Sequence, residues 1–99
     1  MTASANPPAN TPGVVAILPG VLQRLFPGAP RRVELRAACV AEAIDGLDAR
    51  WPGMADRIRD SRPAIRRHMN VFVDGERAAL ETRLREGSTV IVMTAVSGG

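Results

Sequence analysis

The feature that most constrains the fold is a change of hydrophobic period near residue 40. Residues 33–37 alternate apolar and charged side chains, as a half-buried β-strand does. Apolar side chains then recur at helical spacing up to Trp51, where Pro52 and Gly53 end the pattern. An amphipathic helix must bury its apolar stripe, so this order predicts a sheet backed by a helix. The apolar stripe consists of Val40, Ala43, Ile44, Leu47 and Trp51.

Turn signals divide the rest of the chain into further strands. The strongest signal is Asp74-Gly75, directly after an apolar run, because a two-residue hairpin turn needs positive φ at both positions. Proline and glycine mark another turn at residues 26–30, and Gly87 marks a third. The expected elements are strands at 14–18, 33–37, 69–73, 76–78 and 89–95, a helix at 40–51, a polar stretch compatible with a helix at 54–60, and one helical turn around Leu80 and Leu84.

A chain of 99 residues has room for one domain, because two cores of half this size would each bury too little surface. We expect an α+β domain over residues 14–95, with a mixed sheet of four or five strands packed on one main helix. Residues 1–13 carry no charged side chain and are expected to form a disordered lead-in, and residues 96–99 a flexible tail. The longest apolar run is far shorter than the ~20 residues that cross a bilayer, and no secretory signal pattern is visible. The chain is therefore expected to be cytoplasmic, with no membrane partner.

Clusters of nucleophiles or metal ligands are not visible in the sequence. Cys39 is the single cysteine and His68 the single histidine, which leaves neither an internal disulfide nor a zinc site. We expect Cys39 to be a small buried residue, although its place beside the helix start would also favour a thiolate, and we expect His68 at the surface. No glycine-rich phosphate motif occurs. We therefore expect a protein that is not an enzyme and binds no cofactor or metal.

All thirteen basic residues are arginine. A GC-rich coding sequence would explain this usage, as it would the abundance of alanine, glycine and proline. The usage would also suit a protein whose carboxyl end becomes an activated acyl group, because lysine can lose its proton and attack such a group whereas arginine stays protonated. Five of the arginines lie in residues 57–67, interleaved with aspartates and without aromatic residues for base stacking. We expect this stretch to be a solvated face, with no nucleic-acid partner.

The chain stops at Gly98-Gly99, a few residues after its last predicted strand. An ordinary frayed terminus would look the same. Two glycines nevertheless have a physical use, because without Cβ atoms they pass through a narrow channel and leave the final carbonyl open to approach from either side. Residues 95–99 would reach about 17 Å when extended. That length is enough to place the last carboxylate deep in the active site of another protein.

These features together resemble the ThiS/MoaD family of sulfur carriers, which have the β-grasp fold of ubiquitin. The resemblance covers residues 14–99 and depends on the order and spacing of several short motifs. The chain departs from the family at Ser88, where an acidic residue is common, and at Thr94, where proline is usual. The matching motifs are Leu18-Pro19 with Leu22, Leu47 with Trp51-Pro52-Gly53-Met54, Asn70-Val71-Phe72-Val73-Asp74-Gly75, Glu86-Gly87-Ser88 and Ala95-Val96-Ser97-Gly98-Gly99.

The resemblance implies a carrier whose working group is the carboxylate of Gly99. An E1-like partner would use ATP to adenylate Gly99, and sulfur from a persulfide would replace AMP to give a thiocarboxylate. A sulfur-acceptor enzyme would then take the sulfur. The residues that would thread into these partners are Ala95, Val96, Ser97 and Gly98. The free chain is expected to be a monomer.

The acceptor pathway and the class of function stay open at this point. Relatives serve molybdopterin, cysteine, thiamine and secondary-metabolite synthesis, and the length and ending of this chain favour the molybdopterin and cysteine branches. Two other functions share the fold: a ubiquitin-like modifier that is joined to lysines of other proteins, and an interaction domain with an inert tail.

Docking needs a surface as well as a tail. If Val71 and Val73 point toward the helix, period-two alternation places Phe72 on the opposite face of the sheet, together with Ile91 and Met93. One helix leaves that face uncovered, so these three residues would form an exposed apolar patch. By similarity to ubiquitin, we expect partners to dock there. A shift of one residue in the strand phase would instead place all three in the core.

Overall fold

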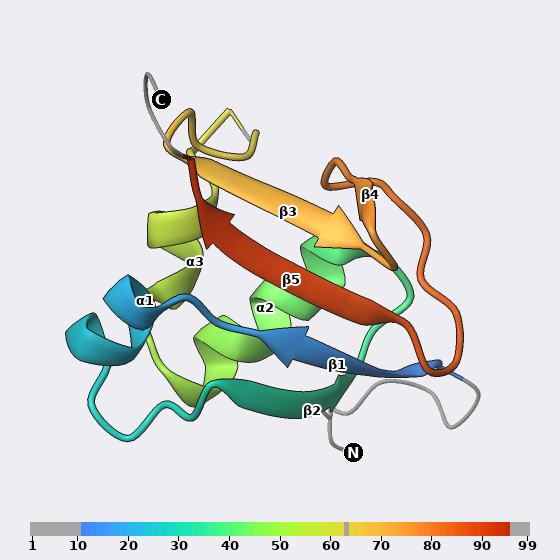
Figure 1. The fold of residues 1–99 in the computed structure, drawn as a ribbon, viewed down its shortest axis with the longest axis horizontal. Helices are drawn as coiled ribbons and strands as arrows, with labels where there is room; N and C mark the ends of the chain where they lie inside the picture. Colours follow the sequence, from blue (N-terminus) through green and yellow to red (C-terminus); the bar gives the residue numbers. More distant parts are fainter. Residues whose placement is uncertain (1–10, 63, 96–99) are drawn as a thin grey trace, which may run out of the picture.

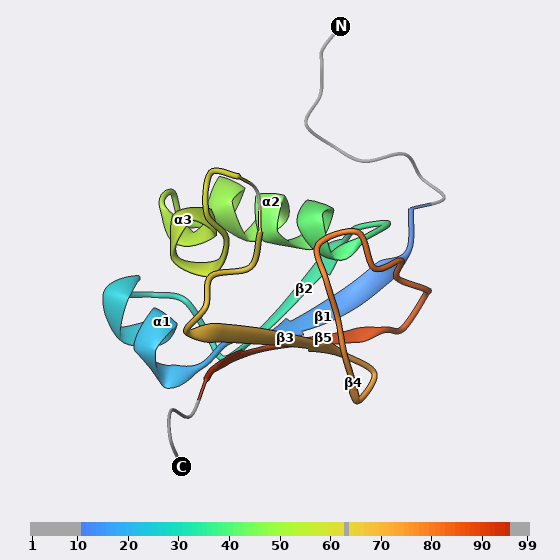
Figure 2. The same cartoon turned by 90° about the horizontal axis from the view of Figure 1, so that it is seen from above.

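The computed structural model describes residues 11–62 and 64–95 of the chain. Five strands form one sheet in the order β2-β1-β5-β3-β4, in which β1 and β5 are parallel and the other neighbours antiparallel. Helices α2 and α3 cover one side of the sheet and α1 lies at its end (Figures 1 and 2). The elements are β1 (Gly13–Ile17), α1 (Gly20–Leu25), β2 (Arg32–Arg36), α2 (Val40–Arg50), α3 (Met54–Ile58), β3 (Met69–Val73), β4 (Glu76–Arg77) and β5 (Thr89–Thr94).

The predicted α+β class, the mixed sheet and the main helix are confirmed. Helix α2 ends at Arg50, and Trp51 follows it as the C-cap, with its N–H donating to the Leu47 carbonyl at 2.9 Å. The hairpin after β3 turns at Asp74 and Gly75, with φ of 51° and 91°. These are the two positive values that the Asp-Gly turn requires.

The core lies between the sheet and α2. The inner residues of the strands alternate with outer ones, and Val40, Ala43, Ile44 and Leu47 of α2 pack on them with almost no solvent exposure, whereas Trp51 is half-buried. Helix α1 adds Leu22, which is 1% exposed, and α3 adds Met54 and Ile58, both fully buried. Cys39, expected to be buried, is half-buried at the N-cap of α2.

The helical turn expected around Leu80 and Leu84 is wrong. The chain makes an irregular turn there, and its carbonyls accept hydrogen bonds from the first turn of α2: Val40 N–H to Thr82 O at 3.0 Å and Ala41 N–H to Leu80 O at 2.8 Å. The first N–H groups of a helix have no partner within it. The segment around Leu80 gives its backbone carbonyls to the N–H groups of α2, so these carbonyls do not form the hydrogen bonds of a local helix.

Helix α1 was not predicted at all. It has six residues, follows Pro19 without a side-chain cap, and buries only Leu22. So short a helix depends on packing more than on intrinsic propensity. Within the described residues, no helix is long and apolar enough to span a membrane.

Two aspartates fix the chain after α2. One Asp48 carboxylate oxygen accepts the N–H groups of Gly53 and Ala55, each at 3.0 Å, and so caps α3, where Gly53 has φ of 99°. The Asp60 carboxylate accepts the N–H groups of Arg62 and Ala64, each at 2.9 Å. The hydrogen bond from the Arg62 backbone is the main cause that lowers the pKa of Asp60, followed by that from the Arg62 side chain.

Candidate docking face and tail

Strand β5 holds the root of the tail. It lies in the middle of the sheet, with β1 on one side and β3 on the other, so its position is fixed from both sides. Pairing continues one residue beyond it, because Ala95 N–H donates to the His68 carbonyl at 2.8 Å. Val96, Ser97, Gly98 and Gly99 lie outside the described residues, so the threading and acyl roles assigned to them stay predictions.

The strand phase agrees with the alternation argument. Val71, Val73, Val90 and Val92 are buried under the helices. On the opposite side, which we call the outer face, Phe72 and Ile91 are half-buried and Met93 is 45% exposed. Figure 2 shows no helix over this face. A one-residue shift that would bury Phe72, Ile91 and Met93 is therefore excluded, whereas their role in docking stays a prediction.

Two residues of β1 were missed. Ile17 pairs in register with Ile91, and Ile91 pairs with Phe72, so the three form one cross-strand row on the outer face. We call Ile17, Ile91 and Phe72 the apolar row. Val15 lies beside it, opposite Thr89. Every residue from 14 to 18 is apolar, so that segment carries no alternation to show which side chains face outward.

Beyond the apolar row, β1 leaves the sheet. Its pairing with β5 ends at Ile17 opposite Ile91, so the last residues of β5 pair with β3 alone. A hollow of about 420 Å³ occupies the vacated side, lined among others by Pro19, Gln23 and Met93. The strand that leads to the tail therefore has open space beside it just before the tail begins.

A scan of protein families matches residues 15–99 to the ThiS family. The chain belongs to the ThiS family. A chain of the crystal structure of the Amycolatopsis orientalis BexX/CysO complex is similar, with 30% identity and a TM-score of 0.77 over 87% of this chain and 99% of that one. SAMP1 from Haloferax volcanii is similar with 27% identity and a TM-score of 0.73, over 88% of this chain and 99% of that one. No curated protein matches the chain at a significant level.

A third structure supports the fold alone. Mycobacterium tuberculosis CysO has 24% identity and a TM-score of 0.75, over 84% of this chain and 99% of its own. The expected β-grasp fold is thus confirmed, and the chain is a ubiquitin-fold member of a family of sulfur carriers. Members of this family are small carrier proteins rather than catalysts.

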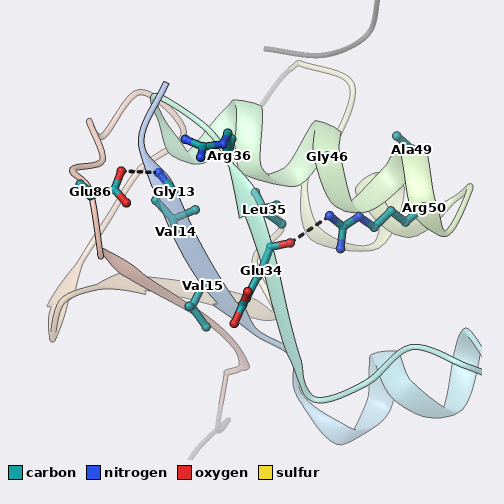
Figure 3. A pocket seen from close by; sticks show the side chains of 10 residues that line it. All are labelled: Gly13, Val14, Val15, Glu34, Leu35, Arg36, Gly46, Ala49, Arg50 and Glu86. Atoms are coloured by element: carbon teal, nitrogen blue, oxygen red, sulfur yellow. Dashed lines mark hydrogen bonds between the residues drawn. The ribbon is translucent and has the colours of Figure 1, made fainter. Parts of the chain in front are cut away.

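The ThiS-family chain has a hollow of about 700 Å³ at the β2 edge beside α2 (Figure 3). Two hydrogen bonds cross its wall: Arg50 Nη2 donates to the Glu34 carbonyl at 2.9 Å, and Gly13 N–H donates to Glu86 Oε1 at 2.8 Å. The first of these occupies a backbone acceptor on the exposed edge, which hinders addition of another strand. The wall contains no nucleophile with a neighbouring base. In the part of the chain that the structure describes, no three His, Cys, Asp or Glu side chains gather as metal ligands would.

Proposed function

We propose that this chain carries sulfur as a thiocarboxylate on Gly99. The observation that carries the proposal is the position of β5, a central strand of a ThiS-family domain that leads within five residues into Gly98-Gly99. A strand held on both sides gives the tail a fixed origin. The conformational freedom that the partner must restrict is then that of the tail alone.

The chemistry needs three steps on the partner enzyme. A Gly99 carboxylate oxygen attacks the α-phosphate of ATP, which gives an acyl adenylate and releases pyrophosphate. The terminal sulfur of a persulfide attacks the acyl carbon and AMP leaves, and cleavage of the S–S bond by a thiol leaves the thiocarboxylate. The partner enzyme binds the ATP, and this chain contributes only its acyl end.

The geometry of the described residues suits such a transfer. The apolar row and Met93 lie on the outer face, and Met93 belongs to the same strand that continues into the tail. A partner that docks on the outer face therefore fixes the origin of the tail in the same contact. From Ala95, the tail reaches about 17 Å when extended. We assign two partners to this surface, an E1-like activating enzyme and a sulfur-acceptor enzyme, and place the free monomer in the cytoplasm.

Pyrophosphate exchange tests the activation step. Incubated with an E1-like enzyme from the same genome and ATP, the chain should support ATP–pyrophosphate exchange. One alanine added after Gly99 should abolish the exchange, because the side chain and extra length displace the carboxylate. One alanine added before Met1 is the matched control and should have no effect. Exchange at the normal rate with the elongated tail would contradict the proposal.

A second candidate is a protein modifier, favoured by one comparison. The Haloferax volcanii structure that shares 25% identity is a small archaeal modifier protein. As a modifier, this chain would form an isopeptide bond from Gly99 to lysines of other proteins. Tryptic digests of cells would then contain lysine peptides that carry the end of the tail as a branch. If such branches are absent while thiocarboxylate forms, the carrier function stands alone. If deletion of Gly98 and Gly99 changes neither outcome, the tail is inert.

A further inference from the structure

The apolar row ends in an arginine on each side. In register, Arg32 of β2 lies opposite Ile17, and Arg77 of β4 lies opposite Phe72. The row therefore runs across all five strands, with three apolar side chains in the middle and a guanidinium group at either end. At about 4.8 Å per strand, the two arginine backbones lie roughly 19 Å apart.

Arg77 makes one hydrogen bond on this face. Its Nη2 donates to Oδ1 of Asn70 at 2.5 Å, and Asn70 lies on the same face of β3, two residues before Phe72. Within residues 11–62 and 64–95, this is the side-chain hydrogen bond that Arg77 makes, and a guanidinium has further donors that an acceptor on a partner can use. A guanidinium with a fixed orientation loses less conformational freedom on binding, and its planar fork matches a carboxylate.

The outer face carries excess positive charge. Among its strand residues, Arg32, Arg36 and Arg77 are positively charged and Glu34 is negatively charged, and the exposed Asp74 follows β3 at one end of the face. In residues 11–62 and 64–95, the ion pairs involve Arg59 with Asp45 and Arg62 with Asp60, and neither pair includes a residue of the row. Arg36 donates to the Thr11 carbonyl at 2.8 Å, which leaves its charge in place.

We propose that the outer face selects an acidic protein surface, in which an apolar strip is flanked on both sides by carboxylates that receive Arg32 and Arg77. The inference rests on the proposed function, since the partner is the activating enzyme. A protein suits this face better than a polyanion does. Glu34 lies beside the row and repels phosphates, and Phe72 is the only aromatic side chain in the row for base stacking.

Charge reversal at the two ends of the row tests the inference. The dissociation constant of the activating enzyme is measured by titration calorimetry for wild type, Arg32→Glu and Arg77→Glu at low and high salt. Each reversal should weaken binding by about tenfold, because it replaces an attraction with a repulsion, and high salt should reduce the difference. Asn70→Ala should weaken binding less, by about threefold, since it frees Arg77 without removing its charge. Arg57→Glu makes the same charge change on an exposed residue of α3 and should stay within twofold of wild type.

A chain without Gly98 and Gly99 separates this inference from the proposed function. It should support no pyrophosphate exchange, whereas Arg32→Glu and Arg77→Glu made in this shortened chain should still weaken enzyme binding by about tenfold relative to the shortened chain alone. If Arg32→Glu and Arg77→Glu bind as wild type while wild type is activated, the charge inference is overturned and the carrier function stands. If the reversals weaken binding but wild type supports no pyrophosphate exchange, the charge inference stands and the carrier function is overturned. The same variants are also tested for binding to single-stranded DNA and to anionic vesicles. If Arg32→Glu and Arg77→Glu abolish wild-type binding to either of these but leave enzyme binding unchanged, the inference is overturned. Thermal unfolding checks each fold, and Arg→Gln variants replace any reversal that unfolds.

Discussion

Truncation of Val92 should mainly lower the stability of the fold, whereas truncation of its neighbour Ile91 should mainly impair activation by the partner enzyme. Val92 is 2% exposed beneath the helices, whereas Ile91 is half-buried on the outer face. Val92→Ala removes two buried carbons at about 0.8 kcal/mol each, and the residual cavity raises the loss to about 2 kcal/mol. Ile91→Ala removes three carbons, yet should cost less than about 1 kcal/mol because outer-face packing is incomplete.

Urea unfolding followed by circular dichroism measures both losses of free energy, and thermal unfolding measures the matching shifts in melting temperature. For a domain of this size, the Val92→Ala variant should melt about 8–16 °C lower and Ile91→Ala only a few degrees lower. Pyrophosphate exchange at limiting chain concentration should show the opposite order, with Ile91→Ala impaired and Val92→Ala near normal below its melting temperature. If the larger truncation at Ile91 destabilises the fold more than the truncation at Val92, the assignment of faces is refuted.

The loops and caps offer three further tests, two by urea unfolding and one by acid unfolding. Gly53→Ala should destabilise the chain by about 1–2 kcal/mol because φ there is 99°, whereas the matched Gly46→Ala in α2 should stabilise it by up to about 1 kcal/mol. Equal effects would contradict the turn geometry. Asp48→Ala should lower the free energy of unfolding by about 1–2 kcal/mol because it uncaps α3, and an unchanged free energy would contradict a stabilising cap. The stabilising contribution of Asp60 is present above its unfolded pKa near 3.8 and is lost as the pH falls through the lower folded pKa. Asp60→Asn should therefore flatten this part of the acid unfolding curve. An unchanged curve would contradict the lowered pKa of Asp60.

Local sequence was enough to predict the elements that carry their own signals. Helix α2 has four apolar positions at one period, with Trp51 as the C-cap and a Pro-Gly stop after it, and the hairpin at Asp74-Gly75 has the residues that its turn demands. The segment around Leu80 shows the opposite case. Its apolar spacing is helical, but its carbonyls bond to Val40 and Ala41, forty residues earlier in the chain. No local pattern reports such a partner.

The candidate site divides in the same way. Alternation within single strands placed Phe72, Ile91 and Met93 on the outer face correctly. Ile17 could not be found from its own uniformly apolar segment. The row from Arg32 to Arg77 depends on the order of all five strands and on the parallel pairing of β1 with β5, which joins residues far apart in the chain. That Arg32 and Arg77 lie at the ends of the apolar row can be inferred only from the strand register.

The intact mass of the chain after incubation with the activating enzyme, ATP and a persulfide donor is the most direct test of the carrier function. A thiocarboxylate at Gly99 should raise the mass by the exchange of one oxygen for sulfur, located at Gly99 by fragmentation and lost when Gly99 is followed by an extra residue. An unchanged mass in a reaction where ATP is consumed and the enzyme binds the chain would contradict it.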